Sequence, residues 1–150
     1  SDVYKRQILK YPSHKDYTDT ELALKYLIDK GFKEIVLMGV IGSRIDHTLA
    51  NIFLLSELLN QGVKGIIINE KNTMHIIDDE MEIKKEDGVF ISVLPINSDG
   101  AKVTLKGFEY ETDRVDFNFS STLGVSNRII EEKGYIKVEN GICLIIESRD

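Results

Sequence analysis

The chain has 150 residues, enough for one ordinary domain or two small ones, and 42% of them are hydrophobic, which suffices for a packed core. Its net charge of −6 argues against nucleic acid as the main partner, because phosphate binding requires a basic face. No apolar stretch approaches the roughly 20 residues that span a bilayer, and the single cysteine, Cys143, excludes an internal disulfide framework. We therefore expect a cytoplasmic protein without membrane contact, in which Cys143 is a small buried hydrophobic residue.

The first seven residues lack an initiator methionine and run directly into a short strand-like piece at 8–11. A Pro-Ser-His sequence at 12–14 ends that predicted strand. We expect residues 1–7 to be a non-native junction or a truncation scar, with sequence missing upstream of them.

The next elements alternate between helix and strand. The capping-box pattern at 18–21 predicts the start of a helix that ends just before Gly31. The apolar run at 34–38 predicts a buried strand, helical spacing of apolar residues predicts a second helix over about 46–60, and 65–69 predicts another strand. Because strands that alternate with helices form parallel sheets with crossover helices, the first 70 residues resemble half of an α/β domain.

Beyond residue 72 the pattern changes to short branched or aromatic runs at about ten-residue spacing. Turn signals separate the runs, and Asn140-Gly141 is a strong signal for a β-hairpin. The other turn signals are Asp87-Gly88, Asp99-Gly100 and Lys133-Gly134. This pattern predicts an antiparallel all-β module, either a sandwich or a small barrel, and divides the chain into residues 1–72 and 73–150.

A first polar cluster lies at 15–19, where the first predicted helix begins. Thr18 or Asp19 as a helix cap explains part of it, because acids and hydroxyls suit the open N–H groups there. Capping does not explain Lys15 and Asp16. Two carboxylates three residues apart, at Asp16 and Asp19, suit Mg²⁺, which favours one or two carboxylates together with substrate phosphate oxygens.

A second cluster follows the strand at 34–38, where a glycine loop leads into a helix. Open α/β sheets usually bind their ligands at such a junction. Gly39 and Gly42 permit a tight turn with the backbone close to a ligand, and Arg44 offers a planar fork of donors suited to phosphate. The loop is not a Walker A motif, because its glycine spacing differs and no Gly-Lys-Ser/Thr follows.

The helix after this loop carries three more polar residues. Asp46 reads on structural grounds as a plain N-cap, and His47 as a surface residue. Asn51 is harder to explain in this way, because Asn is a mediocre residue for a helix interior. A third cluster, residues 123–127 in the β module, reads as a turn when it is taken alone.

Taken together, these clusters resemble the successive motifs of thiamine pyrophosphokinases, in the same order and at matching intervals. The matching motifs are residues 15–19, residues 39–47 with Asn51, and residues 124–127; residues 107–110 (Gly-Phe-Glu-Tyr) resemble the segment before the last motif. The resemblance covers essentially all of 8–150. It implies an enzyme that transfers pyrophosphate from ATP to the hydroxyl of thiamine, giving thiamine diphosphate and AMP.

The resemblance also implies a fold and an assembly. The fold is a partial Rossmann-like parallel α/β catalytic domain followed by an antiparallel β-sandwich domain that binds thiamine. The assembly is a homodimer, in which thiamine lies between the catalytic domain of one subunit and the β domain of the other.

By position, the resemblance implies roles for individual residues. Asp16 and Asp19 belong to the Mg²⁺ and phosphate region, and Ser126 and Asn127 face thiamine. The residues implied for ATP are Lys15, Thr18, Gly42, Arg44, His47 and Asn51. The implied catalytic residues are Asp46, Arg44 and Asp19, with Asp46 as our hypothesis for the base that accepts the proton of the thiamine hydroxyl.

Two departures from the family pattern remain. The family has two glycines before the arginine, whereas this chain has Gly42-Ser43, which fits if the φ angle of Ser43 is negative. The family's catalytic domain begins with a Gly-Asp-x-Asp-Ser loop, which nothing here matches. We interpret this second departure as truncation; the alternatives are a non-catalytic thiamine- or nucleotide-binding homologue, and a pyrophosphokinase for another alcohol such as a pterin.

Overall fold

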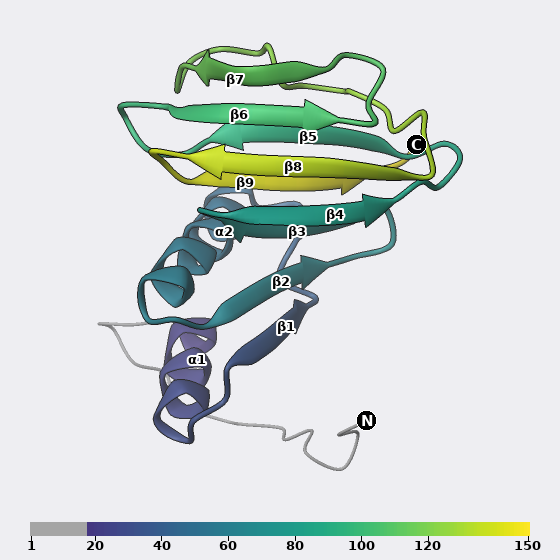
Figure 1. Ribbon diagram of the computed structural model, residues 1–150. Coiled ribbons are helices and arrows are strands. Elements are labelled where there is room, and N and C mark those ends of the chain that lie inside the picture. Colours follow the sequence, from purple (N-terminus) through teal and green to yellow (C-terminus); the bar gives the residue numbers. More distant parts are fainter. Residues whose placement is uncertain (1–17) are drawn as a thin grey trace.

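The computed structural model describes residues 18–150, which form two helices and two stacked β-sheets (Figure 1). Sheet A has five strands in the order β1-β2-β3-β9-β5, and sheet B has four in the order β4-β8-β6-β7. The helices are α1 (Asp19–Asp29) and α2 (Ile45–Asn60). The strands are β1 (Glu34–Met38), β2 (Lys64–Ile68), β3 (Asn72–Ile77), β4 (Glu80–Lys84), β5 (Phe90–Pro95), β6 (Ala101–Lys106), β7 (Thr112–Phe117), β8 (Lys133–Glu139) and β9 (Cys143–Ser148). The predicted strand at 8–11 lies outside the described residues.

Local sequence signals explain both ends of α1. The hydroxyl of Thr18 accepts a hydrogen bond of 3.2 Å from the Glu21 N–H, as a capping box requires. At the other end Lys30 is the C-cap, and Gly31 has a φ of +88°, a left-handed conformation that glycine adopts without steric cost. The predicted helix is confirmed.

The predicted unit of strand, loop, helix and strand is also confirmed. β1 and β2 pair in parallel, and α2 connects them. One detail is wrong: the N-cap of α2 is Arg44, which is extended at φ −84° and ψ 110°, and Asp46 lies inside the first turn. The helix begins earlier than the position of the acidic residue suggested, and the Arg44 side chain makes no capping hydrogen bond.

The two parts of the chain share one sheet. β2 pairs antiparallel with β3, and β3 in turn pairs with β9, so sheet A continues from the α/β part into the β module. Our proposed boundary between residues 72 and 73 therefore lies within β3. Sequence patterns identify strands but do not show which strands pair across such a boundary.

Sheet A is the middle of three layers. On one face, β1, β2 and β3 place Ile35, Ile67 and Met74 in a core with Leu55 and Leu58 of α2. On the other face, strands β5 and β9 pack against sheet B in a second core built from buried side chains of both sheets. Figure 1 shows the helices beside β1 and β2 at one end of the molecule, with β7 of sheet B at the other end. The β module is thus a sandwich rather than a small barrel.

One predicted hairpin and one predicted turn are wrong. Asn140-Gly141 does not form a hairpin, because β8 belongs to sheet B and β9 to sheet A; the segment crosses between the sheets, with Asn140 at a φ of +56°. Lys133-Gly134 begins β8 instead of making a turn. Gly134 is needed there because a Cβ would lie 2.8 Å from the Phe108 ring.

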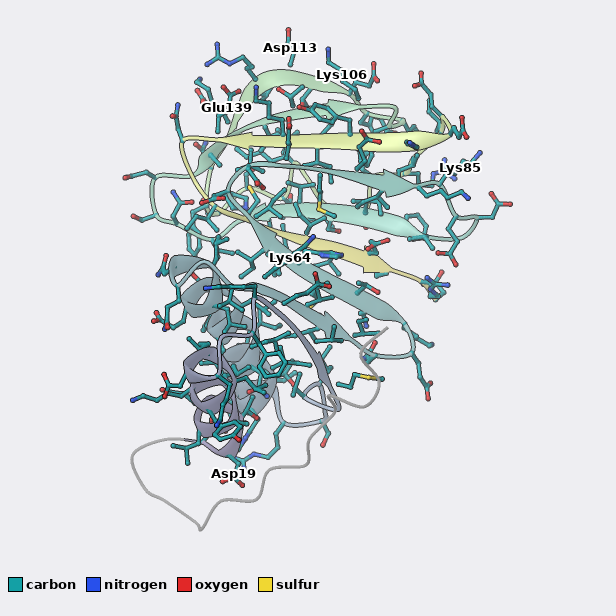
Figure 2. The ribbon with its side chains drawn as sticks, turned by 60° about the horizontal axis from the view of Figure 1, so that its bottom comes forward. Asp19, Lys64, Lys85, Lys106, Asp113 and Glu139 are labelled. Atoms are coloured by element: carbon teal, nitrogen blue, oxygen red, sulfur yellow. The ribbon has the colours of Figure 1, made fainter. Side chains whose placement is uncertain are left out.

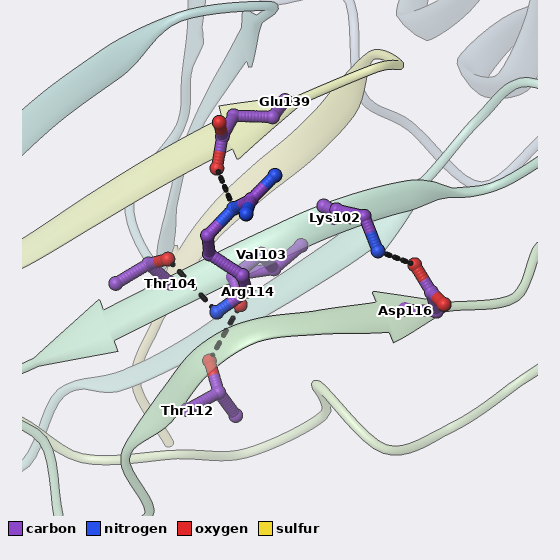
Figure 3. A network of polar contacts seen from close by, with 7 residues as sticks. All are labelled: Lys102, Val103, Thr104, Thr112, Arg114, Asp116 and Glu139. Carbon is purple, nitrogen blue, oxygen red and sulfur yellow. Dashed lines mark hydrogen bonds and ion pairs between the residues drawn. The ribbon is translucent and has the colours of Figure 1, made fainter.

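Sheet B ends in an irregular edge (Figure 3). The pairing of β6 and β7 shifts its register between Val103 and Leu105, and Arg114 opposite has a φ of +50°. The Arg114 N–H donates to the Thr104 hydroxyl at 3.1 Å, and the Thr112 hydroxyl donates to the Val103 carbonyl at 2.8 Å. These bonds satisfy backbone groups that the bulge removes from the ladder.

No helix within residues 18–150 is long and apolar enough to cross a membrane. Cys143, the first residue of β9, is fully buried between the sheets, as expected of a small hydrophobic residue. Burial raises the pKa of its thiol to about 12.

Candidate functional site

A surface pocket of about 390 Å³ lies where β1 ends and α2 begins. The start of α1, the glycine loop and the first turns of α2 meet there. Its lining residues are Thr20, Gly39, Val40, Gly42, Ser43, Arg44, His47 and Asn51. Four residues predicted for ATP, Gly42, Arg44, His47 and Asn51, are thus brought together, and Thr20 is a wall residue that the sequence did not indicate.

The backbone of the glycine loop leaves room in this pocket. Gly39 has a φ of +73°, a conformation that L side chains rarely adopt. Gly42 does not have a left-handed φ, and a Cβ added there would meet no atom within 4 Å. Ser43 is not among the residues with positive φ, so it replaces the second family glycine without strain.

Side chains of α2 hold the loop in place. The Asn51 amide donates to the Val40 carbonyl at 3.1 Å, which accounts for an Asn inside this helix. The Thr48 hydroxyl accepts from the Gly42 N–H at 3.2 Å and lies 3.4 Å from the Gly42 carbonyl, to which it donates. Thr48 is not among the predicted site residues. The available signal was its position three residues before Asn51, which puts both side chains on one face of the helix.

Arg44 and Asp46 form an ion pair at the mouth of the pocket. The guanidinium bonds both carboxylate oxygens, with Nη2–Oδ2 at 2.7 Å and Nε–Oδ1 at 3.2 Å. The His47 N–H also donates to Asp46 Oδ1, at 2.9 Å. The Arg44 hydrogen bond, and after it the His47 N–H, lower the pKa of Asp46 below its ordinary value.

This pairing bears on the chemistry that Asp46 can perform. A carboxylate whose pKa is lowered holds a proton less well, so it is a weaker general base than an ordinary aspartate. The same two-point contact fixes the plane of the Arg44 guanidinium. The arrangement therefore suits the placement of positive charge beside the pocket better than the acceptance of a proton.

The N-terminal cluster is described only in part, since Lys15 and Asp16 lie outside the described residues. Asp19 is exposed at the start of α1, and its neighbour Thr20 lines the pocket. Figure 2 shows Asp19 at the end of the molecule opposite Asp113. The Thr18 hydroxyl caps the helix, so its interaction in this structure is structural.

Within residues 18–150 no group of three or more His, Cys, Asp or Glu side chains could hold a metal ion. Mg²⁺ bound to a nucleotide needs only one or two protein carboxylates, because phosphate oxygens and water complete its coordination. Asp19 has the required chemistry and lies next to a residue of the pocket wall. It is compatible with such a site as one member of a pair.

The predicted thiamine segment, residues 124–127, lies along the edge of β5. Ile91 and Asn127 exchange backbone hydrogen bonds of 2.8 and 2.9 Å, and the Val93 N–H donates to the Gly124 carbonyl at 2.8 Å. A Cβ at Gly124 would lie 2.2 Å from the Val93 carbonyl oxygen, so only glycine fits. The segment is an extension of sheet A rather than an isolated turn.

The Asn127 side chain is buried, and both its oxygen and its nitrogen form hydrogen bonds within the chain. Its Oδ1 accepts from the N–H groups of Tyr110 at 3.1 Å and Arg128 at 2.9 Å, and its Nδ2 donates to the Tyr110 carbonyl at 2.8 Å. Ser126 has a φ of +61°, and its N–H donates to the Ser92 hydroxyl at 3.1 Å. Strained backbone at a residue other than glycine is enriched at functional sites.

Within residues 18–150, the two halves of the predicted site do not meet in one pocket. Neither Ser126 nor Asn127 lines the pocket beside Arg44. Around residues 124–127, several large apolar side chains are exposed. They are Tyr110, Phe119, Leu123, Val125 and Ile130.

Comparison with known proteins gives consistent results along the chain. The family models described as "Thiamin pyrophosphokinase, catalytic domain" and "Thiamin pyrophosphokinase, vitamin B1 binding domain" match residues 2–67 and 75–143. A curated relative, the thiamine pyrophosphokinase of Bacillus subtilis, is 33% identical over 142 residues, which are 93% of this chain and 66% of the relative.

Solved structures of thiamine pyrophosphokinases are also similar to this chain. The crystal structure of thiamine pyrophosphokinase from Bacillus subtilis superposes with a TM-score of 0.86 at 33% identity, over 91% of this chain and 65% of that one. The corresponding structure from Geobacillus thermodenitrificans gives 0.81 at 28% identity, over 93% and 65%. The chain therefore spans just under two thirds of the length of these relatives.

Proposed function

The chain belongs to the thiamine pyrophosphokinase family, and on this premise we propose that the protein transfers a pyrophosphoryl group from ATP to thiamine. The observation that carries the proposal is the succession, along one chain, of matches to the catalytic domain and to the vitamin B1 binding domain of that family. The products are thiamine diphosphate and AMP.

The proposed reaction is a displacement at the β-phosphorus of ATP. The hydroxyl oxygen of thiamine forms a bond to this phosphorus, and the bond from the phosphorus to the oxygen that bridges to the α-phosphorus breaks. AMP leaves with the bridging oxygen, and the thiamine hydroxyl loses its proton. Such transfers depend mainly on positioning and on neutralising the charge of the phosphate oxygens.

We assign the polyphosphate of ATP to the pocket beside α2. Gly42 leaves space there, the first turn of α2 presents backbone N–H groups without helical partners, and Arg44 adds a fixed positive charge. His47 lines the same pocket, and Asn51 holds its loop. We propose that Asp46 acts first by orienting Arg44, and that acceptance of the hydroxyl proton is its secondary role.

We assign the metal and phosphate region to Asp16 and Asp19, with Lys15 and Thr18 beside them. Mg²⁺ held there with the nucleotide would neutralise negative charge on the phosphate oxygens. Support for this assignment is the chemistry of the carboxylates and the position of Asp19 next to the pocket wall.

We assign thiamine to the neighbourhood of Ser126, where Asn127 shapes the site by holding the backbone of Tyr110. We further propose a cytoplasmic homodimer with the site shared between subunits. Two observations support the shared site: the pocket beside Arg44 contains no residue of the β module, and large apolar side chains are exposed around residues 124–127.

The proposal is tested by incubating the full-length protein with Mg²⁺ and ATP, with and without thiamine, and measuring AMP by chromatography. We expect AMP only in the presence of thiamine, equimolar with thiamine diphosphate, and lost when Mg²⁺ is removed. Saturable thiamine binding without AMP would contradict catalysis and indicate a binding homologue. AMP formed only with a pterin alcohol would contradict the assignment of the acceptor.

A further inference from the structure

Thr48 is the one side chain that bonds both backbone groups of Gly42 among the described residues. Its Oγ1 accepts from the Gly42 N–H at 3.2 Å and donates to the Gly42 carbonyl at 3.4 Å. A hydroxyl is able to do both at once because it carries one donor and two acceptor lone pairs. Thr48 does not itself line the pocket.

We propose that Thr48 is a positioning residue for the nucleotide: its hydroxyl fixes the orientation of Gly42, and so keeps open the part of the pocket that receives the polyphosphate. This inference rests on the proposed function, which identifies the ligand of the pocket as a nucleoside triphosphate. Thr48 acts through Gly42 and does not touch the substrate.

Gly42 needs such an anchor. A residue without a Cβ occupies a wide range of φ and ψ, and rotation of Gly42 would displace Ser43 and Arg44, which follow it in the pocket wall. Asn51 anchors the loop at Val40, two residues earlier, so Thr48 and Asn51 hold the loop on both sides of Ile41.

The contact also determines which donors remain for phosphate. The Gly42 N–H is directed to Thr48, and the His47 N–H is directed to Asp46. The nucleotide is therefore left with the other N–H groups at the start of α2 and with Arg44. Without the Thr48 hydroxyl, the Gly42 backbone would no longer be held in one orientation, and the donors that remain for phosphate would no longer have fixed positions. The helix α2 itself stays intact.

The test compares Thr48→Val, which keeps the shape and removes the hydroxyl, with Thr48→Ser, which keeps the hydroxyl. Thr112→Val is the matched control, because it removes a hydroxyl that also donates to a backbone carbonyl, but in sheet B. We expect Thr48→Val to raise the KM for ATP about three- to tenfold and to lower kcat by a smaller factor through Arg44, with the KM for thiamine changed less than about twofold. Thr48→Ser restores a KM near that of the wild type, and Thr112→Val leaves the KM unchanged.

A second readout does not depend on catalysis. Hydrogen exchange of the Gly42 amide, followed by NMR, should be about tenfold faster in Thr48→Val than in the wild type or in Thr48→Ser. Equal exchange rates in all three proteins would overturn the inference, as would equal KM values for ATP in Thr48→Val and Thr48→Ser. A wild-type protein that makes no thiamine-dependent AMP contradicts the proposed function instead, and the exchange measurement then decides the role of Thr48 alone.

Discussion

The guanidinium of Arg44 contacts both carboxylate oxygens of Asp46, at 2.7 and 3.2 Å, although 70% and 65% of the two side chains are exposed. Exposed ion pairs contribute little to stability, so this contact matters mainly for geometry. It directs a fixed positive charge along the rim of a pocket in which Arg44 is the one lysine or arginine among the described lining residues.

Arg44 should determine the pH at which Asp46 becomes protonated. Arg44 lowers the pKa of this carboxyl, so Asp46 stays charged to a lower pH than an ordinary aspartate, and the pair's stabilising effect is lost only as the pH falls through the lowered value. In Arg44→Met the pKa of Asp46 should rise toward its ordinary range. NMR titration of the Asp46 carboxyl carbon measures this, and the same titration midpoint in both proteins would contradict the account.

Replacing Asp46 itself should affect turnover. Asp46→Asn keeps the size of the side chain but removes the charge that orients Arg44, so we expect kcat to fall about tenfold or more. The KM for thiamine should change little, because the pocket beside Asp46 is assigned to the nucleotide. Steady-state kinetics with thiamine varied at saturating ATP give both values, and an unchanged kcat would refute a role for Asp46.

Two glycines should respond to alanine in opposite ways. Gly124→Ala forces a Cβ to within 2.2 Å of the Val93 carbonyl oxygen, and we expect a loss of about 3 kcal/mol in the free energy of unfolding. Gly42→Ala meets no atom within 4 Å, so its stability should stay equal or rise by up to about 1 kcal/mol. Gly42→Ala should instead raise the KM for ATP, because the new methyl group occupies the pocket.

Denaturant unfolding of the two variants, together with ATP kinetics of Gly42→Ala, checks this pair of predictions. Equal free energies of unfolding for the two alanine variants would show that the Val93 carbonyl oxygen leaves room for a Cβ at position 124. A normal KM for ATP in Gly42→Ala would show that the polyphosphate does not lie over Gly42.

Asn127 should be a major contributor to stability. Asn127→Ala leaves three hydrogen-bonding groups of Tyr110 and Arg128 without their side-chain partner in a partly buried environment, which should cost about 1–3 kcal/mol. Asn69→Ala is the matched control, since Asn69 also bonds nearby backbone N–H groups but lies in a turn where water replaces it. Urea unfolding of both variants should show the larger loss for Asn127→Ala.

Cys143 should be inert in the folded protein. Its side chain is fully buried, and burial raises the pKa of the thiol to about 12, so the thiolate is nearly absent at pH 8. We expect no reaction with an aromatic disulfide reagent until the protein is unfolded, when one thiol per chain reacts. Rapid reaction in native buffer would mean that the core between the sheets opens readily.

The sequence was sufficient for elements whose signals are local. The capping hydroxyl of Thr18, the glycine at position 31 and the branched run of β1 each act within a few residues, and the corresponding helix and strand were found at the expected places. The family motif at 39–47 with Asn51 likewise indicated most residues that line the pocket beside α2, because they come from one short stretch of the chain; Thr20 of α1 was not indicated.

Features that depend on contacts distant in sequence were not predictable. Asn140-Gly141 has the local chemistry of a hairpin, yet it connects two sheets, because the pairing of β9 with β3 and β5 is decided by the packing of the two cores. The hydrogen bonds between the Asn127 amide and the backbone of Tyr110, 17 residues away, likewise have no local sequence signal. The spacing of Thr48 and Asn51 places both on one face of α2, but the bonds between the Thr48 hydroxyl and Gly42 depend on how the loop folds back onto the helix.

The most direct test of the central proposal is a labelling experiment on the full-length protein with Mg²⁺, thiamine, and ATP that carries distinct isotopic labels on its β- and γ-phosphates. Pyrophosphoryl transfer predicts that both labels appear together in thiamine diphosphate, with one unlabelled AMP released for each molecule formed. Labelled ADP accompanied by a singly labelled thiamine monophosphate, or no labelled thiamine product at all, would contradict the account.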